Sequence, residues 1–177
     1  EIPVFMRISH AKTHDLWMLD QLTPQAGAFY VMDRGYIDFA RLHRLHAAAA
    51  FFVTRAKRGL DCRVVQRQAV PPGTGVQRDQ WIRLRGPKSR RLYPDTLRRV
   101  GYVDPERQKR FTFLTNNTAL EAGTVAWLYR KRWRIELFFK WVKQHLHIKA
   151  FFGTTPNAVK TQLWIAVIVY VLTVKLK

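Results

Sequence analysis

Four polar side chains that suit phosphodiester chemistry share one side of a predicted helix. The apolar pattern predicts this helix from about Thr124 to His145, and it carries Tyr129, Arg132, Glu136 and Lys143. At about 100° per residue their spacing places them within an arc of roughly 60°. A carboxylate can bind a divalent cation, and arginine or lysine can bind phosphate, so the stripe suits work on a nucleic-acid backbone.

Ordinary ion pairing along the helix is the competing interpretation. Arg132 with Glu136, and Glu136 with Lys140, have the i,i+4 spacing of surface ion pairs. The rest of the helix is largely apolar, which predicts that it packs into a core and that its polar stripe faces a cleft. The chain has only four glutamates, and this one stands among many cations, which favours a functional stripe.

A second candidate carboxylate, Asp33, follows the apolar run Ala28–Met32. That run predicts a strand buried on both faces, as in a mostly parallel sheet, with a turn at Arg34 and Gly35. An aspartate in this position is often only a turn residue. Active sites of α/β proteins lie at the carboxyl ends of strands, however, so Asp33 is also placed for catalysis.

The elements that would position these residues form an α/β pattern interrupted by a β-rich region. The expected elements before Gly59 are a strand over Pro3–Ile8, a helix over His14–Leu22 capped by Thr13, the strand before Asp33, a helix over Phe39–Ala49 capped by Asp38, and a strand from Phe51. After the long helix, Phe151 and Phe152 predict a loop. Thr155 and Pro156 open a last helix that ends near Lys175.

Residues 60–118 predict a small antiparallel β region with basic outward faces. Three segments alternate in polarity: Cys62–Val65, Gln80–Arg85 and Arg110–Leu114. The cations expected on its surface are Arg83, Arg85, Lys88, Arg90, Arg91, Arg98, Arg99, Lys109 and Arg110. These cations form either a solvated face or a DNA contact, and the charge of the chain favours DNA.

Composition points to a folded, nucleic-acid-binding protein. The 177 residues carry a formal charge of +19, and a hydrophobic fraction of 47% excludes a disordered basic tail. A single cysteine, Cys62, excludes an internal disulfide framework and a cysteine-rich zinc site. The apolar segment Leu163–Val174 is shorter than the roughly 20 residues that cross a bilayer, so a buried core helix is expected there.

The spacing of the helix stripe, Y-x2-R-x3-E-x6-K, resembles the YREK signature of bacterial cut-and-paste insertion-sequence transposases, a branch of the DDE transposase superfamily. The strand that ends in Asp33, followed by Arg34, Gly35 and Tyr36, is similar to the segment that carries the second catalytic aspartate of that family. Residues 157–166 also resemble the family's C-terminal helix. The resemblance covers nearly the whole chain.

The resemblance implies an RNase H-like α/β fold, a mixed sheet flanked by helices. The expected organisation is the first part of that core in residues 1–59, a basic β-rich insertion in 60–118, and core helices with the YREK motif in 119–177. If Asp33 ends the fourth strand of this fold, the first strands lie upstream of Glu1. Because Asp15 and Asp20 fall on a predicted helix, the first catalytic aspartate is expected to be missing and the chain to be inactive alone.

The implied activity is metal-dependent nicking and strand transfer at transposon ends. The resemblance makes Asp33 and Glu136 the catalytic metal ligands, sharing two Mg²⁺ ions for which Mn²⁺ can substitute. If they share an ion, their carboxyl groups should lie roughly 4–7 Å apart. Two hypotheses compete with this one: a non-catalytic DNA-binding remnant, and an RNA-associated basic protein with an accidental match.

The resemblance also implies DNA contacts and partners. Tyr129, Arg132 and Lys143 are expected to position phosphates near the cut, while Arg83 and Arg85 contact DNA from the insertion. The expected partners are double-stranded DNA, both transposon ends and target, and a second copy of the chain in a homodimer. The expected location is the bacterial cytoplasm at the nucleoid, with no membrane.

The remaining polar residues favour structural roles. The pairs His43/His46 and His145/His147 lack the cysteine or HExxH context of a metal site, so surface or hydrogen-bonded histidines are expected. Trp81 or Tyr93 could stack on an unpaired base, and packing within the β region is equally compatible with their sequence context.

Overall fold

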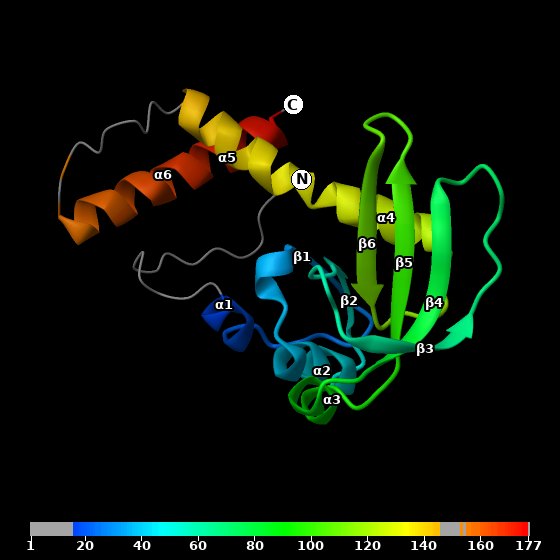
Figure 1. Cartoon of the computed structure of the whole chain (residues 1–177). Helices are drawn as coiled ribbons and strands as arrows, with labels where there is room; N and C mark the ends of the chain where they lie inside the picture. Colours follow the sequence, from blue (N-terminus) through cyan, green and yellow to red (C-terminus); the bar gives the residue numbers. More distant parts are fainter. Residues whose placement is uncertain (1–15, 146–152, 154, 177) are drawn as a thin grey trace. The chain divides into compact units, whose positions relative to one another are not determined.

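The computed structural model describes residues 16–145, 153 and 155–176. They divide into two units, residues 16–132 and the described residues from Trp133 onward. The expected strand Pro3–Ile8, the cap Thr13 and the loop at Phe151 and Phe152 lie outside the described residues. Figure 1 shows the chain coloured along its sequence.

The elements of the first unit are, in chain order, α1 (Trp17–Asp20), β1 (Phe29–Met32), the 3-10 helix η1 (Arg34–Tyr36), α2 (Phe39–Ala47), β2 (Phe51–Arg55), β3 (Cys62–Arg67), β4 (Val76–Leu84), α3 (Pro87–Leu92), β5 (Leu97–Asp104), β6 (Lys109–Thr115) and α4 (Ala122–Lys131). The second unit contains α5 (Trp133–His145) and α6 (Pro156–Lys175). Asp38 caps α2 as expected, because its Oδ1 accepts a hydrogen bond from the Arg41 N–H at 3.0 Å.

The first unit is built on one six-stranded sheet in the order β1-β2-β6-β5-β4-β3. Strands β1 and β2 are parallel, and every other neighbouring pair is antiparallel. The antiparallel β region expected after Gly59 therefore exists, and it continues the sheet of β1 and β2 through the pairing of β6 with β2. The mixed sheet predicted for the core is confirmed, while the boundaries of the insertion stay a prediction.

Helices cover both faces of this sheet. Because side chains alternate along a strand, Phe52 and Leu114 enter a core with residues of α2 such as Leu42, while Val53 and Phe113 enter a second core with α4. Figure 1 shows α4 running behind β4, β5 and β6. The result is a three-layer α/β arrangement whose α4 face carries the site described below.

Several expected elements differ in detail. The side chain of Phe29 on β1 is 38% exposed, so the expectation of a strand buried on both faces is wrong. Among the described residues β1 has β2 as its one neighbouring strand, which leaves it at an edge. The helix expected over His14–Leu22 is only the four residues of α1 in the described part. Strand β5 and helix α3 were not predicted.

The long helix expected from Thr124 to His145 is two helices. Helix α4 ends at Lys131, and the Arg132 N–H binds the Tyr129 carbonyl at 3.1 Å, the tight i→i−3 pattern of a helix end. Helix α5 then begins at Trp133. The four positions of the stripe are thus divided between α4, the Arg132 turn and α5, and a single continuous helical face does not hold them.

Helix α6 differs from the buried core helix that was expected. Its N-terminus is capped by Thr155, whose Oγ1 accepts from the Ala158 N–H at 3.2 Å. Tyr170 packs against Phe138 of α5 at 4.7 Å between ring centroids. Yet only 6% of its apolar 18-residue window is buried, and large side chains such as Ile168, 55% exposed, face outward. By length and composition alone this 20-residue helix could cross a membrane, a property that core helices share.

Candidate active site

Asp33 lies at the carboxyl end of β1, and its backbone is fixed by two neighbours. Its extended conformation continues the alternation of the strand, which directs the side chain away from the Met32 core and toward the α4 face. Its Oδ1 accepts a hydrogen bond from the Gly35 N–H at 3.3 Å, and Thr54 donates to its carbonyl at 3.2 Å. The side chain remains 49% exposed. Asp33 is therefore a turn residue that still offers a carboxylate to an external ligand.

Helix α4 brings Tyr129 and Arg132 to this carboxylate. Tyr129 is buried and packs on Phe113 of β6, with ring centroids 4.9 Å apart. Arg132 follows at the helix end, and its Nη1 lies 3.7 Å from Asp33 Oδ2. The Arg132 guanidinium carbon is also 5.6 Å from the centre of the Tyr129 ring. Arg132 of the expected stripe thus contacts the expected strand-end aspartate, and Tyr129 lies beside Arg132.

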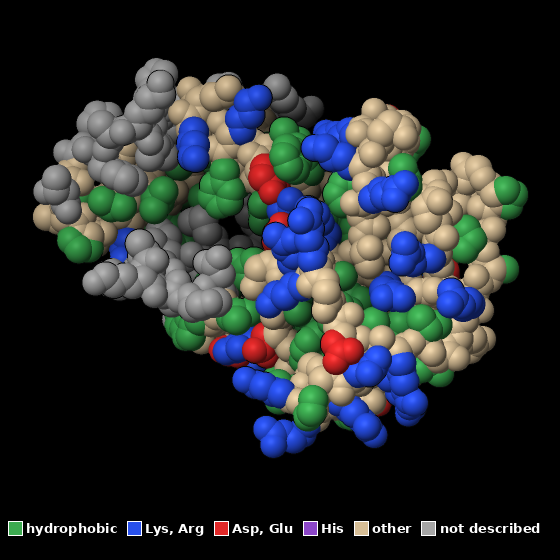
Figure 2. Space-filling model, in the orientation of Figure 1, with side chains coloured by type: hydrophobic (Ala, Val, Ile, Leu, Met, Phe, Trp, Pro, Cys, Tyr) green, Lys and Arg blue, Asp and Glu red, His purple; other side chains and the backbone are tan. Residues whose placement is uncertain are grey.

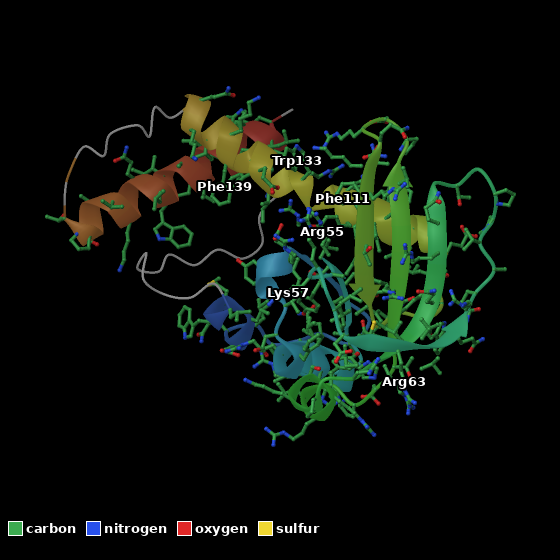
Figure 3. The ribbon with its side chains drawn as sticks, viewed as in Figure 1. Arg55, Lys57, Arg63, Phe111, Trp133 and Phe139 are labelled. Carbon is green, nitrogen blue, oxygen red and sulfur yellow. The ribbon has the colours of Figure 1, made fainter. Side chains whose placement is uncertain are left out.

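Arg55 belongs to the same site and was missed by the sequence analysis. The parallel register pairs Met32 with Thr54, so the next residue of β2, Arg55, lies beside Asp33 at the sheet edge. Its guanidinium carbon is 5.1 Å from the centre of the Phe111 ring, and Figure 3 shows the two side chains together. A basic residue two positions after the apolar run Phe51–Val53 was the available signal, but its meaning depends on the register.

Electrostatics links these side chains. Burial raises the pKa of the Tyr129 hydroxyl above its usual value, and the Asp33 charge adds to this, while Arg132 and Arg55 oppose it. The hydroxyl therefore stays protonated at neutral pH and can donate a hydrogen bond. One carboxylate, two guanidinium groups and a neutral phenol form a cluster suited to holding a phosphate near a bound cation.

Glu136 and Lys143 belong to the second unit. Both lie on α5, where Glu136 is in the first turn and partly buried and Lys143 is exposed. They are seven positions apart in the sequence, which places them two turns apart on one helix face. The convergence of Asp33 with Glu136 stays a prediction.

The donor chemistry at Asp33 fits one ligand of a divalent metal. Hard cations such as Mg²⁺ bind carboxylate oxygens. In this structure Asp33 Oδ2 faces the positively charged Arg132 guanidinium. Within the part of the chain that the structure describes, no group of three or more His, Cys, Asp or Glu side chains is placed to hold a metal. Within residues 16–132, Asp33 is therefore a candidate for a single metal ligand.

The basic surface of the β region is confirmed in part. Arg83 and Arg85 are exposed, and Arg63 on β3 lies directly opposite Arg83 on β4, a pairing of like charges that a bound polyanion would relieve. Figure 2 shows cations spread over this unit. Arg98 is an exception, because it is buried in an ion pair with Asp79, and Arg99 is half-buried against Gln80. The expectation that both face outward is wrong.

The other residues singled out from the sequence have structural contacts. His43 Nε2 lies 3.0 Å from Asp95 Oδ2, and His46 Nδ1 lies 2.9 Å from the Tyr93 hydroxyl, so this histidine pair is hydrogen-bonded as expected. Tyr93 is fully buried and is therefore unavailable for stacking on a base. Cys62 is half-buried beside Arg99. The side chains of His145 and His147 lie outside the described residues.

A mixed six-stranded sheet with helices on both faces matches the RNase H-like α/β fold that was expected. Comparison with known families takes the assignment one step further. A model of the family described as "Transposase DDE domain" matches residues 1–172. The chain belongs to this family, whose relatives include transposases of bacterial insertion sequences.

Three curated relatives agree. A Sinorhizobium fredii protein named as a transposase is 35% identical over 176 residues, which cover 97% of this chain and 49% of that protein. A Geobacillus stearothermophilus transposase for an insertion sequence element is 36% identical over 90% of this chain and 42% of its own length. A Synechocystis protein named as a transposase for an insertion sequence element is 26% identical over 85% of this chain and 41% of its own length. The chain thus spans about half the length, or less, of these relatives.

Proposed function

We propose that this chain is part of the catalytic domain of a DDE transposase that nicks DNA at transposon ends and joins the cut strands to target DNA. The family assignment supports the class of protein. The observation that carries the chemistry is the contact of Asp33 with Arg132 beside Tyr129 and Arg55, at the carboxyl end of a parallel strand. Acidic groups that hold metal and cations that hold phosphate are both needed there.

Asp33 and Glu136 are the proposed metal ligands. Two Mg²⁺ ions, or Mn²⁺ in their place, would supply activation of the attacking oxygen and neutralisation of the leaving oxygen. The Gly35 N–H binds Oδ1 and the Thr54 hydroxyl binds the Asp33 carbonyl, so Oδ2, which lies beside Arg132, is the oxygen proposed to bind the metal. A third carboxylate, outside the residues assigned here, is proposed to complete the site, so the chain alone should be inactive.

The proposed DNA contacts fall into two groups. Near the cut, Tyr129 donates a hydrogen bond to phosphate, Arg132 and Lys143 bind phosphate by charge, and Arg55 adds a cation stacked on Phe111. Farther away, Arg83 and Arg85 hold the backbone of double-stranded DNA from the proposed insertion at 60–118. A YREK-type transposase of this kind would act as a homodimer on DNA at the bacterial nucleoid, in the cytoplasm.

Metal-dependent nicking tests the proposal. The chain, extended by the reading frame upstream of Glu1, is incubated with supercoiled plasmid and Mg²⁺ or Mn²⁺. We expect nicking, and removal of the metal by a chelator should abolish it. Asp33→Ala or Glu136→Ala should reduce the nicking rate by at least about 10³-fold. Asp38→Ala, which removes a helix cap and an ion pair with Arg41, is the matched control and should keep most activity at low temperature.

The outcomes separate the hypotheses. Nicking that survives both Asp33→Ala and Glu136→Ala would reject the assignment of these residues. An extended protein that binds DNA but never nicks it would favour a non-catalytic remnant. Tighter binding to RNA than to DNA, with no nicking, would favour the RNA-associated alternative.

A further inference from the structure

The two oxygens of Asp33 have different partners. Oδ1 accepts the Gly35 N–H at 3.3 Å, a contact within the strand-end turn. Oδ2 instead faces Arg132, whose Nη1 lies 3.7 Å away. The oxygen that remains for an external ligand is therefore the one that a protein cation already neutralises.

The contact with Arg132 is suited to exchange. At 3.7 Å it is an ion pair longer than a normal hydrogen bond, and the Asp33 side chain is 49% exposed. The Arg132 side chain is only 17% exposed, so an incoming cation reaches the pair from the Asp33 side, where solvent already screens the carboxylate. Arg132 also lies 5.6 Å from the centre of the Tyr129 ring, a contact that can keep the guanidinium in the site after it leaves Oδ2.

We propose that Arg132 is an exchangeable counter-ion for Asp33. It neutralises the carboxylate while no divalent cation is bound. A divalent cation bound at Asp33 would repel the guanidinium, and the displaced Arg132 would then be free to bind a DNA phosphate. This inference rests on the proposed function, since it assumes that Asp33 binds metal, and it adds regulation of metal entry by Arg132.

Mn²⁺ binding to the 177-residue chain tests the exchange directly. Free Mn²⁺ is measured by electron paramagnetic resonance during titration at low ionic strength. Arg132→Gln should bind Mn²⁺ about two- to fivefold more tightly than the unmodified chain, because the competing charge is gone.

Arg130→Gln is the matched control. Arg130 lies at the end of the same helix and makes an exposed ion pair with Glu106 at the same distance, 3.7 Å. Its substitution removes the same charge without touching Asp33. An Arg132→Gln chain that binds Mn²⁺ no more tightly than Arg130→Gln overturns the exchange.

Asp33→Asn separates this inference from the proposed function. Mn²⁺ binding that is unchanged by Asp33→Asn contradicts the metal assignment itself, and the exchange falls with it. If Asp33→Asn weakens Mn²⁺ binding and Arg132→Gln does not strengthen it, the proposed function stands and only the exchange is rejected.

A linkage measurement tests where the guanidinium goes. If DNA phosphate takes Arg132, then a short DNA duplex should tighten Mn²⁺ binding to the unmodified chain, and this gain should be lost in Arg132→Gln. A gain of equal size in both proteins overturns the transfer to phosphate.

Discussion

At the scale of single residues, Arg98 and Asp79 form a buried ion pair with two hydrogen bonds on neighbouring strands of the sheet. Arg98 Nε and Nη2 donate to the two Asp79 oxygens at 2.9 and 2.7 Å, and both side chains are about 95% buried. Arg98 also donates to the carbonyls of Asn117 and Leu120 in the loop before α4. This arginine therefore anchors the helix that delivers Tyr129 and Arg132 to Asp33.

Arg98→Met should destabilise the protein by about 3–5 kcal/mol, because it leaves Asp79 as an unpaired buried charge. Chemical denaturation followed by circular dichroism measures this. The double substitution Arg98→Met/Asp79→Leu should recover much of the loss, and Lys109→Met, at an exposed position of β6, should change stability by less than about 0.5 kcal/mol. A double variant as unstable as Arg98→Met would contradict the assigned cause.

Tyr93 should make the protein sensitive to alkali. Burial, and then the charge of Asp95, raise the pKa of its hydroxyl well above the usual value of 10.0. A group whose pKa is raised on folding stabilises the protein below its unfolded pKa, and the stabilisation is lost as pH rises above about 10. Tyr93→Phe should lower the free energy of unfolding by about 1 kcal/mol at neutral pH, because the hydrogen bond to His46 is lost. The same substitution should make the loss of stability above about pH 10 less steep.

Thermal unfolding from pH 7 to 11 checks the prediction for Tyr93, with Tyr30→Phe, at a half-buried position of the same unit, as the control. An alkaline slope as steep in Tyr93→Phe as in the unmodified protein would show that burial of this hydroxyl is not its cause.

At the scale of elements, local sequence patterns predicted what local interactions determine. The cap Asp38, strand β2 and the cap Thr155 were found from neighbouring residues alone. Strand β5 was missed because Arg98 interrupts its alternation with an inward-facing charge that only distant Asp79 explains. The helix end at Lys131 has no glycine or proline to mark it. In the site, a motif found Asp33, Tyr129 and Arg132, whereas Arg55 required the register of two strands.

The turn before β4 provides an element-scale prediction. Gly75 has φ +75°, and a Cβ there would lie 2.8 Å from the Val103 carbonyl oxygen and 2.9 Å from the Tyr102 ring. Gly73 has φ +76° but open space around it. Gly73→Ala should therefore lower the free energy of unfolding by about 1–2 kcal/mol through backbone strain. Gly75→Ala should lower it by about 1–3 kcal/mol more, because its Cβ also clashes with β5. Equal unfolding midpoints for the two variants would contradict the close approach at β5.

At the scale of the whole molecule, the formal charge of +19 attracts polyanions, and double-stranded DNA is the proposed one. Affinity should fall steeply with salt, and Arg83→Gln/Arg85→Gln should make the slope of log K against log salt shallower by about 2. Fluorescence anisotropy with a labelled duplex measures it. Lys160→Gln/Lys175→Gln on α6 removes the same charge and should leave the slope nearly unchanged. Equal slopes for both double variants would remove Arg83 and Arg85 from the DNA contact.

The central claim is that Asp33 and Glu136, about 100 residues apart in sequence, bind one pair of divalent ions. Crystals of the extended protein with DNA and Mn²⁺ test it, because anomalous scattering locates the metal without reference to the fold. We predict a Mn²⁺ peak within about 2.0–2.6 Å of carboxylate oxygens from both residues. A peak that contacts Asp33 alone, with the Glu136 carboxylate directed away, would contradict the account.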